Sequence, residues 1–236
     1  MAKKIVVTGG SGRFSKVLKK VKSTHKIFYP TKQELNILNF KKIREYLKKV
    51  KPDILIHAAG LSRPMKIHTD DIKKSIDLNI IGTANITKAC SEKNIKLIFL
   101  STSYIYPDKK GNYKESDAIL PSNNYAWSKL GGEAAVQMYK NSLILRLSMT
   151  AKPFIHKKAF TNVKTNFIYH DEVANLILKL LKNRGIINVG GKIQSIYNFA
   201  KRENYKIKKS LLKKKNKNLI PMNATMDVSK LKKILK

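Results

Sequence analysis

The feature that most constrains the fold is a glycine-rich turn close to the N-terminus. A short apolar run, Lys4–Val7, leads through Thr8 into the turn Gly9–Gly12, and an amphipathic segment around Val17–Val21 follows. Glycines let a backbone turn tightly and approach a ligand closely, and the first turn of a helix presents free N–H groups to an anion. The pattern is typical of pyrophosphate binding at the first crossover of a doubly wound α/β sheet, although an ordinary βα loop has it too.

The rest of the chain continues the alternation of strand and helix. Apolar runs that predict further strands are Lys26–Tyr29, Asp53–His57, Lys96–Leu100, Leu143–Leu147 and Gly185–Gly191. Apolar residues at helical spacing predict helices over Phe40–Val50, Asp70–Cys90, Tyr125–Tyr139, Asp171–Leu181 and Val228–Leu235. We therefore expect an α/β fold with a doubly wound, Rossmann-like parallel sheet. Thr150–Asn166 is interpreted as a loop.

Two stretches depart from this regular alternation. Asn79 and Gly82 are poor helix formers inside the long helical segment, which predicts either a special local geometry or a break between two helices. The segment Tyr104–Asn124 is rich in Tyr, Pro, Asp, Gly and Asn, and loops this long in a compact domain are usually functional.

The formal charge of +34, from 49 Lys and Arg against 15 Asp and Glu, allows two interpretations. A nucleic acid or another anionic partner is one, and a lysine-rich composition spread over solvated helix faces is the other. Lysines occur in every segment, the basic stretch Lys206–Lys217 included, and the chain has no arginine-rich tract. We favour the compositional interpretation and expect no nucleic-acid partner.

Compartment and cofactor follow from what the sequence contains. The single Cys90 permits no internal disulfide, and no apolar run approaches the ~18 residues of a membrane span, so we expect a cytoplasmic protein without membrane contact.

An NAD site usually has an acidic residue at the end of the second strand, where this chain has Tyr29 to Lys32. With Arg13 and Lys32 nearby, a 2′-phosphate is better accommodated, which favours NADP over NAD.

Hydroxyl and small side chains follow the central strands. Ala58–Gly60 comes after the third strand and leaves room for a ligand, and Ser101–Ser103 ends the fourth strand at the same edge. His57 precedes Ala58, and packing with a hydrogen bond is favoured for it over catalysis.

Tyr125 and Lys129 lie four residues apart, so a helix places them on one side. A lysine ammonium beside a tyrosine lowers the phenol pKa and makes it a usable acid or base. The same spacing recurs at Tyr106 and Lys110, at Tyr197 and Lys201, and at Tyr205 and Lys209. Only Tyr125 follows a strand that ends in hydroxyls and lies downstream of the glycine turn.

The ordered set of motifs resembles the extended short-chain dehydrogenase/reductases that act on nucleotide sugars, with dTDP-4-dehydrorhamnose reductases as the most similar branch. The motifs that carry the resemblance are Thr8–Gly12, His57–Gly60, Asn79–Thr83, Ser101–Tyr106, Tyr125–Glu133, Arg146, Tyr169–Ala174, Gly185–Gly191 and Pro221–Leu231. The segment Leu147–Tyr169 and the region after Gly191 are shorter than in typical reductases. The resemblance thus implies a dinucleotide-binding core over 1–150 and a single compact unit completed by a small, reduced substrate-binding region over 151–236.

The resemblance also implies roles for individual residues. Tyr125 would protonate a sugar keto oxygen as hydride arrives from a nicotinamide, with Lys129 and Thr102 as the other catalytic residues. The implied cofactor-binding residues are Gly9, Ser11, Gly12, Arg13, Phe14, Ala58, Ala59, Gly60, Asn79, Ser101, Tyr125 and Lys129. The implied substrate-binding residues are Ser103, Arg146 and His156, and no metal is expected.

The implied function is an NAD(P)-dependent reductase of a keto group on a nucleotide-linked sugar in polysaccharide biosynthesis. Two alternatives remain: a nucleotide-sugar epimerase that keeps its NAD bound, and a non-catalytic member that binds a cofactor or nucleic acid. Relatives often pair through their long helices, so a homodimer is possible.

Overall fold

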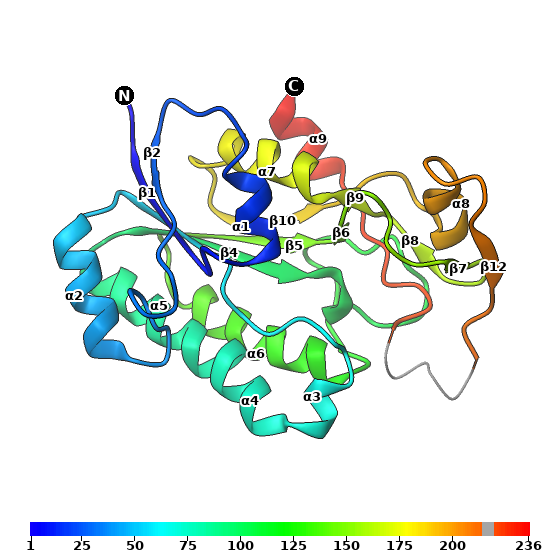
Figure 1. Ribbon diagram of the computed structural model, residues 1–236, viewed down its shortest axis with the longest axis horizontal. Helices are drawn as coiled ribbons and strands as arrows, with labels where there is room; N and C mark the ends of the chain where they lie inside the picture. The colour runs from blue at the N-terminus through cyan, green and yellow to red at the C-terminus, as the bar shows by residue number, and fades with distance from the viewer. Residues whose placement is uncertain (214–219) are drawn as a thin grey trace.

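A central parallel sheet organises the protein, whose computed structural model describes residues 1–213 and 220–236 (Figure 1). Its six strands lie in the order β10-β5-β4-β3-β1-β2. They are β1 (Lys4–Thr8), β2 (Lys26–Phe28), β3 (Ile54–His57), β4 (Lys96–Thr102), β5 (Ser142–Leu147) and β10 (Gly185–Val189). Every residue of β3, β4 and β5 is buried, as expected for a parallel sheet covered on both faces. The predicted doubly wound α/β fold is confirmed.

Helices cover both faces of this sheet. On the upper face in Figure 1 lie α1 (Arg13–Leu18), α7 (His170–Lys179) and α9 (Ser229–Leu235). On the lower face lie α2 (Phe40–Val50), α5 (Gly82–Glu92) and α6 (Asn124–Gln137). Each layer buries its apolar stripe against the sheet, for example Leu18 and Ile177 above it and Leu47 and Ile86 below it.

The strand order places a crevice beside β1. The chain crosses from β1 to β2 in one direction and then returns past β1 to β3 and β4. In such sheets, ligands bind outside the carboxyl ends of the strands where the order reverses. Here those ends are Thr8, His57 and Thr102, so the glycine turn and the strand-end hydroxyls face the same space.

The long helix expected over Asp70–Cys90 is interrupted. The chain instead forms α3 (Ile67–Asp70), α4 (Ile72–Ile76), the π-helix η1 (Asp77–Ile81) and then α5. The special geometry expected at Asn79 is therefore a π-helical turn, a feature often found at functional sites. Helix α6 crosses this turn closely, because a Cβ at Gly132 would lie 2.4 Å from the carbonyl oxygen of Asn79.

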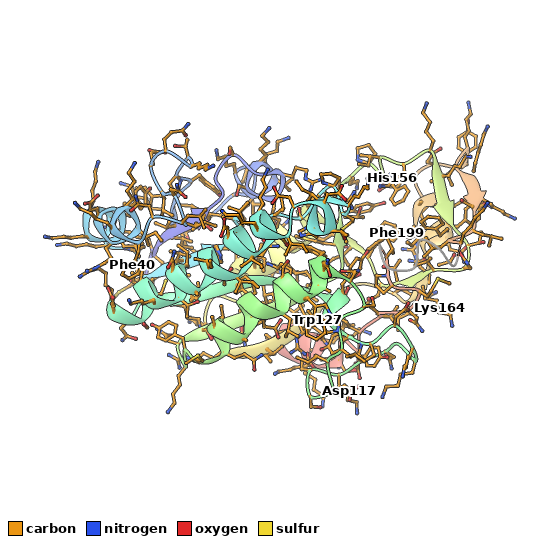
Figure 2. The ribbon with its side chains drawn as sticks, turned by 90° about the horizontal axis from the view of Figure 1, so that it is seen from below. Phe40, Asp117, Trp127, His156, Lys164 and Phe199 are labelled. Atoms are coloured by element: carbon orange, nitrogen blue, oxygen red, sulfur yellow. The ribbon has the colours of Figure 1, made fainter. Side chains whose placement is uncertain are left out.

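The expected loop Thr150–Asn166 contains short strands that pair with later segments. The pairs are β6 (Met149–Thr150) with β9 (Ile168–Tyr169), β7 (Lys158–Phe160) with β12 (Lys208–Ser210), and β8 (Lys164–Thr165) with β11 (Gln194–Ser195). Together with α8 (Ile196–Lys201) they enclose a small apolar cluster around Val163 and Ile207. Figure 2 shows this region, with Lys164 and Phe199, at the end of the molecule opposite Phe40. Residues 214–217 of the predicted basic segment lie outside the described residues.

Candidate active site

The glycine turn is shaped by contacts between β1 and β3. Gly9 has a φ of +71°, and a Cβ there would lie 2.9 Å from Cα of Ala59, so glycine alone fits without strain. The Thr8 hydroxyl accepts hydrogen bonds from the backbone N–H groups of Ala58 (3.2 Å) and Ala59 (3.1 Å). These bonds hold the end of β3 against the turn.

His57 belongs to the same support. Its ring nitrogens lie 2.8 Å from the Thr8 hydroxyl and 3.1 Å from the Thr83 hydroxyl, and burial lowers its pKa to about 3. The ring is therefore neutral and fixed by two hydroxyls. This environment agrees with the packing role favoured from the sequence.

A cavity of about 420 Å³ opens between the turn and the carboxyl ends of the strands. Most of the residues predicted to bind the cofactor line it: Gly9, Ser11, Gly12, Arg13, Phe14, Ala58, Ala59, Gly60, Ser101, Tyr125 and Lys129. Ser15 lines it as well, and its buried hydroxyl has no hydrogen-bond partner among the described residues. We name this space the large cavity.

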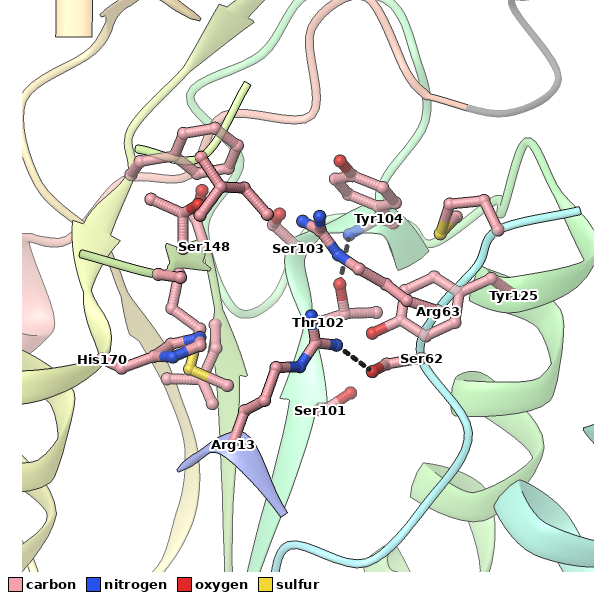
Figure 3. A pocket seen from close by; sticks show the side chains of 17 residues that line it. Arg13, Ser62, Arg63, Ser101, Thr102, Ser103, Tyr104, Tyr125, Ser148 and His170 are labelled. Carbon is pink, nitrogen blue, oxygen red and sulfur yellow. Dashed lines mark hydrogen bonds between the residues drawn. The ribbon is translucent and has the colours of Figure 1, made fainter. Parts of the chain in front are cut away.

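A smaller cavity of about 140 Å³ adjoins it and shares part of its wall (Figure 3). Thr102 and Ser103 line only this smaller cavity, whereas Arg13, Arg63, Ser101, Tyr125 and His170 line both. The Tyr125 side chain therefore stands at the junction of the two spaces.

Tyr125 and Thr102 meet although they come from different elements. Tyr125 lies in the first turn of α6 and Thr102 ends β4, and both side chains line the smaller cavity. Burial raises the pKa of Tyr125, and the neighbouring Thr102 hydroxyl and the charges of Arg63 and Arg13 oppose this rise. The phenol is thus protonated at neutral pH and positioned as a donor.

Lys129 lines the large cavity one helical turn beyond Tyr125, but its environment differs from the expected one. Its Nζ lies 4.1 Å over the ring centroid of Phe99, and burial lowers its pKa to about 7, with Glu133 opposing the shift. The lowering of the Tyr125 pKa by Lys129 stays a prediction, and the cations whose charges lower it here are Arg63 and Arg13.

Asn79 does not line either cavity but supports their wall. Its side chain accepts a hydrogen bond from the Leu61 N–H (2.7 Å) and donates to the Leu61 carbonyl (2.9 Å) and the Ser128 hydroxyl (2.8 Å). It ties the segment that follows Gly60 to helix α6. Its predicted direct contact with a cofactor is replaced by this indirect role.

The prediction that Arg146 binds the substrate is wrong. It is 2% exposed, and its guanidinium donates two hydrogen bonds to Oε1 of Glu133, at 3.0 and 2.7 Å. A third nitrogen bonds the Tyr106 hydroxyl at 2.7 Å and the Glu115 carbonyl at 3.1 Å. The donors are thereby used inside the protein, since the Arg146 position on β5 faces α6 and not the crevice.

The other two predicted substrate residues lie in different places. Ser103 lines the smaller cavity. His156 is exposed and lines neither cavity, but its Nε2 lies 3.5 Å from Nη1 of Arg63, which does. His156 therefore stands at the rim.

Sequence reasoning missed Arg63 and His170, which line both cavities. For Arg63 the sequence held one indication: it lies three residues after Gly60, on the segment that leaves the carboxyl end of β3. Of metal sites there is no sign in residues 1–213 and 220–236, where no cluster of three or more His, Cys, Asp or Glu is found. Within residues 1–213 and 220–236, no helix is long and apolar enough to cross a bilayer.

Comparison with known proteins assigns the family. Residues 3–176 match the family described as the RmlD substrate binding domain. The chain belongs to this family. The resemblance to dTDP-4-dehydrorhamnose reductases found in the sequence is thereby confirmed.

The curated relatives of this RmlD-family chain carry different names. It is 26% identical over 191 residues to a dTDP-4-dehydrorhamnose reductase of Aggregatibacter actinomycetemcomitans, covering 79% of this chain and 60% of the relative. It is 29% identical over 114 residues to methionine adenosyltransferase 2 subunit beta of Xenopus laevis, covering 48% of this chain and 34% of that protein. The chain thus spans about half the length of the curated relatives it matches.

Among solved structures, the fold is similar to that of dTDP-4-dehydrorhamnose reductase from Bacillus anthracis in complex with NADP. The TM-score is 0.86 at 20% identity, with 98% of this chain and 92% of that chain covered. The likeness shows that the two chains share a fold over nearly their whole lengths.

Proposed function

We propose that the protein is an NADP-dependent reductase of a keto group on a nucleotide-linked sugar. The observation that carries the proposal is the position of Tyr125 at the junction of two cavities, with the Thr102 hydroxyl beside it in the smaller one. The large cavity begins at a glycine turn, and the smaller one is bounded by hydroxyl and arginine side chains. A reductase of the dTDP-4-dehydrorhamnose type, as the Aggregatibacter relative is named, needs a donor at such a junction.

The large cavity fits a dinucleotide. Gly9 and Gly12 leave the floor of the turn free of side chains, and the unpartnered Ser15 hydroxyl and the Arg13 guanidinium supply donors for phosphate oxygens. Gly9, Ser11, Gly12, Arg13 and Phe14 would hold the diphosphate. Ala58, Ala59, Gly60 and Ser101 would line the remainder, with Tyr125 and Lys129 at the nicotinamide end. NADPH, when bound, would supply the hydride.

The residues of this chain then do two things. Thr102 orients the keto oxygen and Tyr125 donates its phenolic proton to that oxygen, which a raised pKa permits because the phenol is protonated at neutral pH. Lys129 has a pKa of about 7 in a buried site, so an anionic ligand in the large cavity would draw it to the charged form. Ser103 would contact the sugar.

The test is consumption of NADPH, followed by its absorbance, with dTDP- and UDP-linked 4-keto sugars offered as substrates, both 6-deoxy sugars and uronates. A reductase oxidises NADPH in proportion to the sugar added, whereas an epimerase interconverts sugars without net consumption. A protein that binds NADPH but turns over none of these sugars would contradict the proposal and favour a non-catalytic role.

The assembly and compartment belong to the same proposal. Ile72, Ile76 and Ile81 on α4 and η1 and Trp127 on α6 are 41–53% exposed and form an apolar face that a second copy would cover. We propose a cytoplasmic homodimer paired through this face. Light scattering on the wild type and on Trp127→Glu would give a dimer and a monomer respectively; a monomeric wild type would contradict the pairing.

A further inference from the structure

The two cavities contain cationic side chains without carboxylates. Arg13 and Arg63 line both of them and Lys129 lines the large one, while no Asp or Glu is among the residues that line either. In the described part of the chain, neither Arg13 nor Arg63 takes part in an ion pair. Both guanidinium groups are therefore available to an anionic ligand in the cavities that they line.

Arg63 occupies the substrate side of the junction. It comes from the segment between β3 and α3, and Figure 3 shows its side chain extending into the cavity between Tyr104 and Tyr125. Its contact with His156 uses one nitrogen at 3.5 Å, so most of the five guanidinium N–H donors are free for a ligand. Burial raises the pKa of Tyr104 and of Tyr125, and the charge of Arg63 opposes both rises, whereas Arg13 opposes the rise at Tyr125 alone. Arg63 therefore lies beside both tyrosines.

Arg13 has a different position. It begins α1, directly after the glycine turn, and its Nη2 donates to the Ser62 hydroxyl at 3.2 Å. The anionic phosphates of a dinucleotide in the large cavity account for this cation. Arg63 lines the large cavity as well, but its side chain lies between Tyr104 and Tyr125, next to the reacting groups, where a second anion would lie.

We propose that Arg63 determines substrate specificity by binding a carboxylate carried by the sugar itself, next to the keto group that Tyr125 protonates. The inference rests on the proposed function. In a nucleotide sugar the diphosphate is attached at C1, across the ring from a keto group at C4, whereas a carboxylate on C5 is the neighbour of C4. A planar guanidinium matches a carboxylate through two parallel hydrogen bonds. The substrate class is therefore a keto sugar of the uronate type.

The experiment measures binding and not turnover. Glucose and glucuronate, each linked to UDP and to dTDP, are titrated calorimetrically into the NADPH-loaded protein. The sugars of each pair share the diphosphate and differ only at C6. We expect the glucuronate compounds to bind at least tenfold more tightly, and Arg63→Gln to remove this preference, a loss of about ten- to hundredfold in their affinity.

Two further variants sharpen the result. Arg63→Lys keeps the charge without the fork and is expected to restore only part of the preference. Arg202→Gln, an exposed arginine outside both cavities, is expected to change nothing.

Three outcomes would overturn the assignment. If the wild type binds the glucose and glucuronate compounds equally well, Arg63 does not recognise a sugar carboxylate, but the proposed reductase function still stands. An equal loss for both sugars in Arg63→Gln places Arg63 on the diphosphate instead. Binding of none of the four compounds, with NADPH bound, would overturn the proposed function together with the assignment.

Discussion

Tyr125 is one of several tyrosines with a lysine four residues later, and only its surroundings distinguish it. Thr102 lines the same cavity and lowers its pKa, and His68 packs with its ring at 5.0 Å between centroids. Because the other pairs lack a strand-end hydroxyl in such a position, the spacing carries no chemistry by itself. The contacts around the phenol define the candidate acid.

Replacing Tyr125 with Phe is expected to lower kcat for ketone reduction by about 10²- to 10⁴-fold, since the proton donor is removed. The affinity for NADPH should stay within about twofold. Tyr205→Phe is the matched control, because Tyr205 has the same spacing to Lys209 but is 77% exposed. Steady-state kinetics would contradict the assignment if both variants kept full activity.

Lys129 makes stability depend on pH. Its pKa falls from 10.5 to about 7 on folding because it is buried, so the unfolded chain binds the proton more tightly between these values. The penalty is complete below pH 7 and disappears as the pH rises through 10.5. At pH 7, Lys129→Met should therefore have a free energy of unfolding up to about 5 kcal/mol higher than that of the wild type, measured by urea unfolding. Between pH 7 and pH 10 its stability should rise less than that of the wild type. A variant that is less stable at pH 7 would contradict this.

At the scale of the element, the π-helical turn η1 matters because it aims Asn79 at two neighbours. Asn79→Ala removes the partner of the Leu61 backbone groups and one of the two partners of the Ser128 hydroxyl, which keeps its bond to the Tyr125 carbonyl. We expect a loss of about 2–3 kcal/mol in the free energy of unfolding and weaker NADPH binding. Asn85→Ala on α5 removes one bond to the Ile37 carbonyl and serves as the control, with NADPH affinity unchanged. Urea unfolding measures the stability and a titration measures the NADPH affinity. If both were unchanged in Asn79→Ala, Asn79 would not support the cavity wall.

The pairing of α6 with β5 depends on the buried Arg146 and Glu133, which are 2% and 0% exposed. Arg146→Met leaves a buried carboxylate unpaired, and we expect a loss of about 3–5 kcal/mol. Arg44→Met breaks the exposed pair with Glu92 and should cost about 0–1 kcal/mol. If Arg146→Met unfolds like the wild type and only raises KM for the sugar, the structural role is wrong.

At the scale of the whole molecule, much of the fold follows from sequence pattern. Buried parallel strands are continuous apolar runs, and their carboxyl ends meet at one edge, so Gly9, Ala58, Ser101 and Tyr125 could be placed in one crevice. Side-chain direction could not be predicted: Arg146 faces Glu133 because of how β5 packs on α6. Neither could the paired strands of two or three residues beyond Leu147, which are too short to show periodicity.

Net charge acts on the whole molecule as well. With 49 basic and 15 acidic side chains, self-repulsion destabilises the folded protein, and added salt screens it. The melting temperature should therefore rise between about 20 and 300 mM NaCl, as calorimetry can show. A fall over this range would mean that exposed ion pairs outweigh the repulsion.

The most direct measurement is a titration of NADPH into the wild type and into Gly9→Ala, followed by the fluorescence of the nicotinamide. We predict saturable binding to the wild type at one equivalent per chain, tighter than NADH. Binding to Gly9→Ala should be at least tenfold weaker, because a Cβ at this position would lie 2.9 Å from Cα of Ala59. A wild type that binds no NADPH, or a Gly9→Ala variant that binds it equally well, would contradict a dinucleotide in the crevice beside Tyr125.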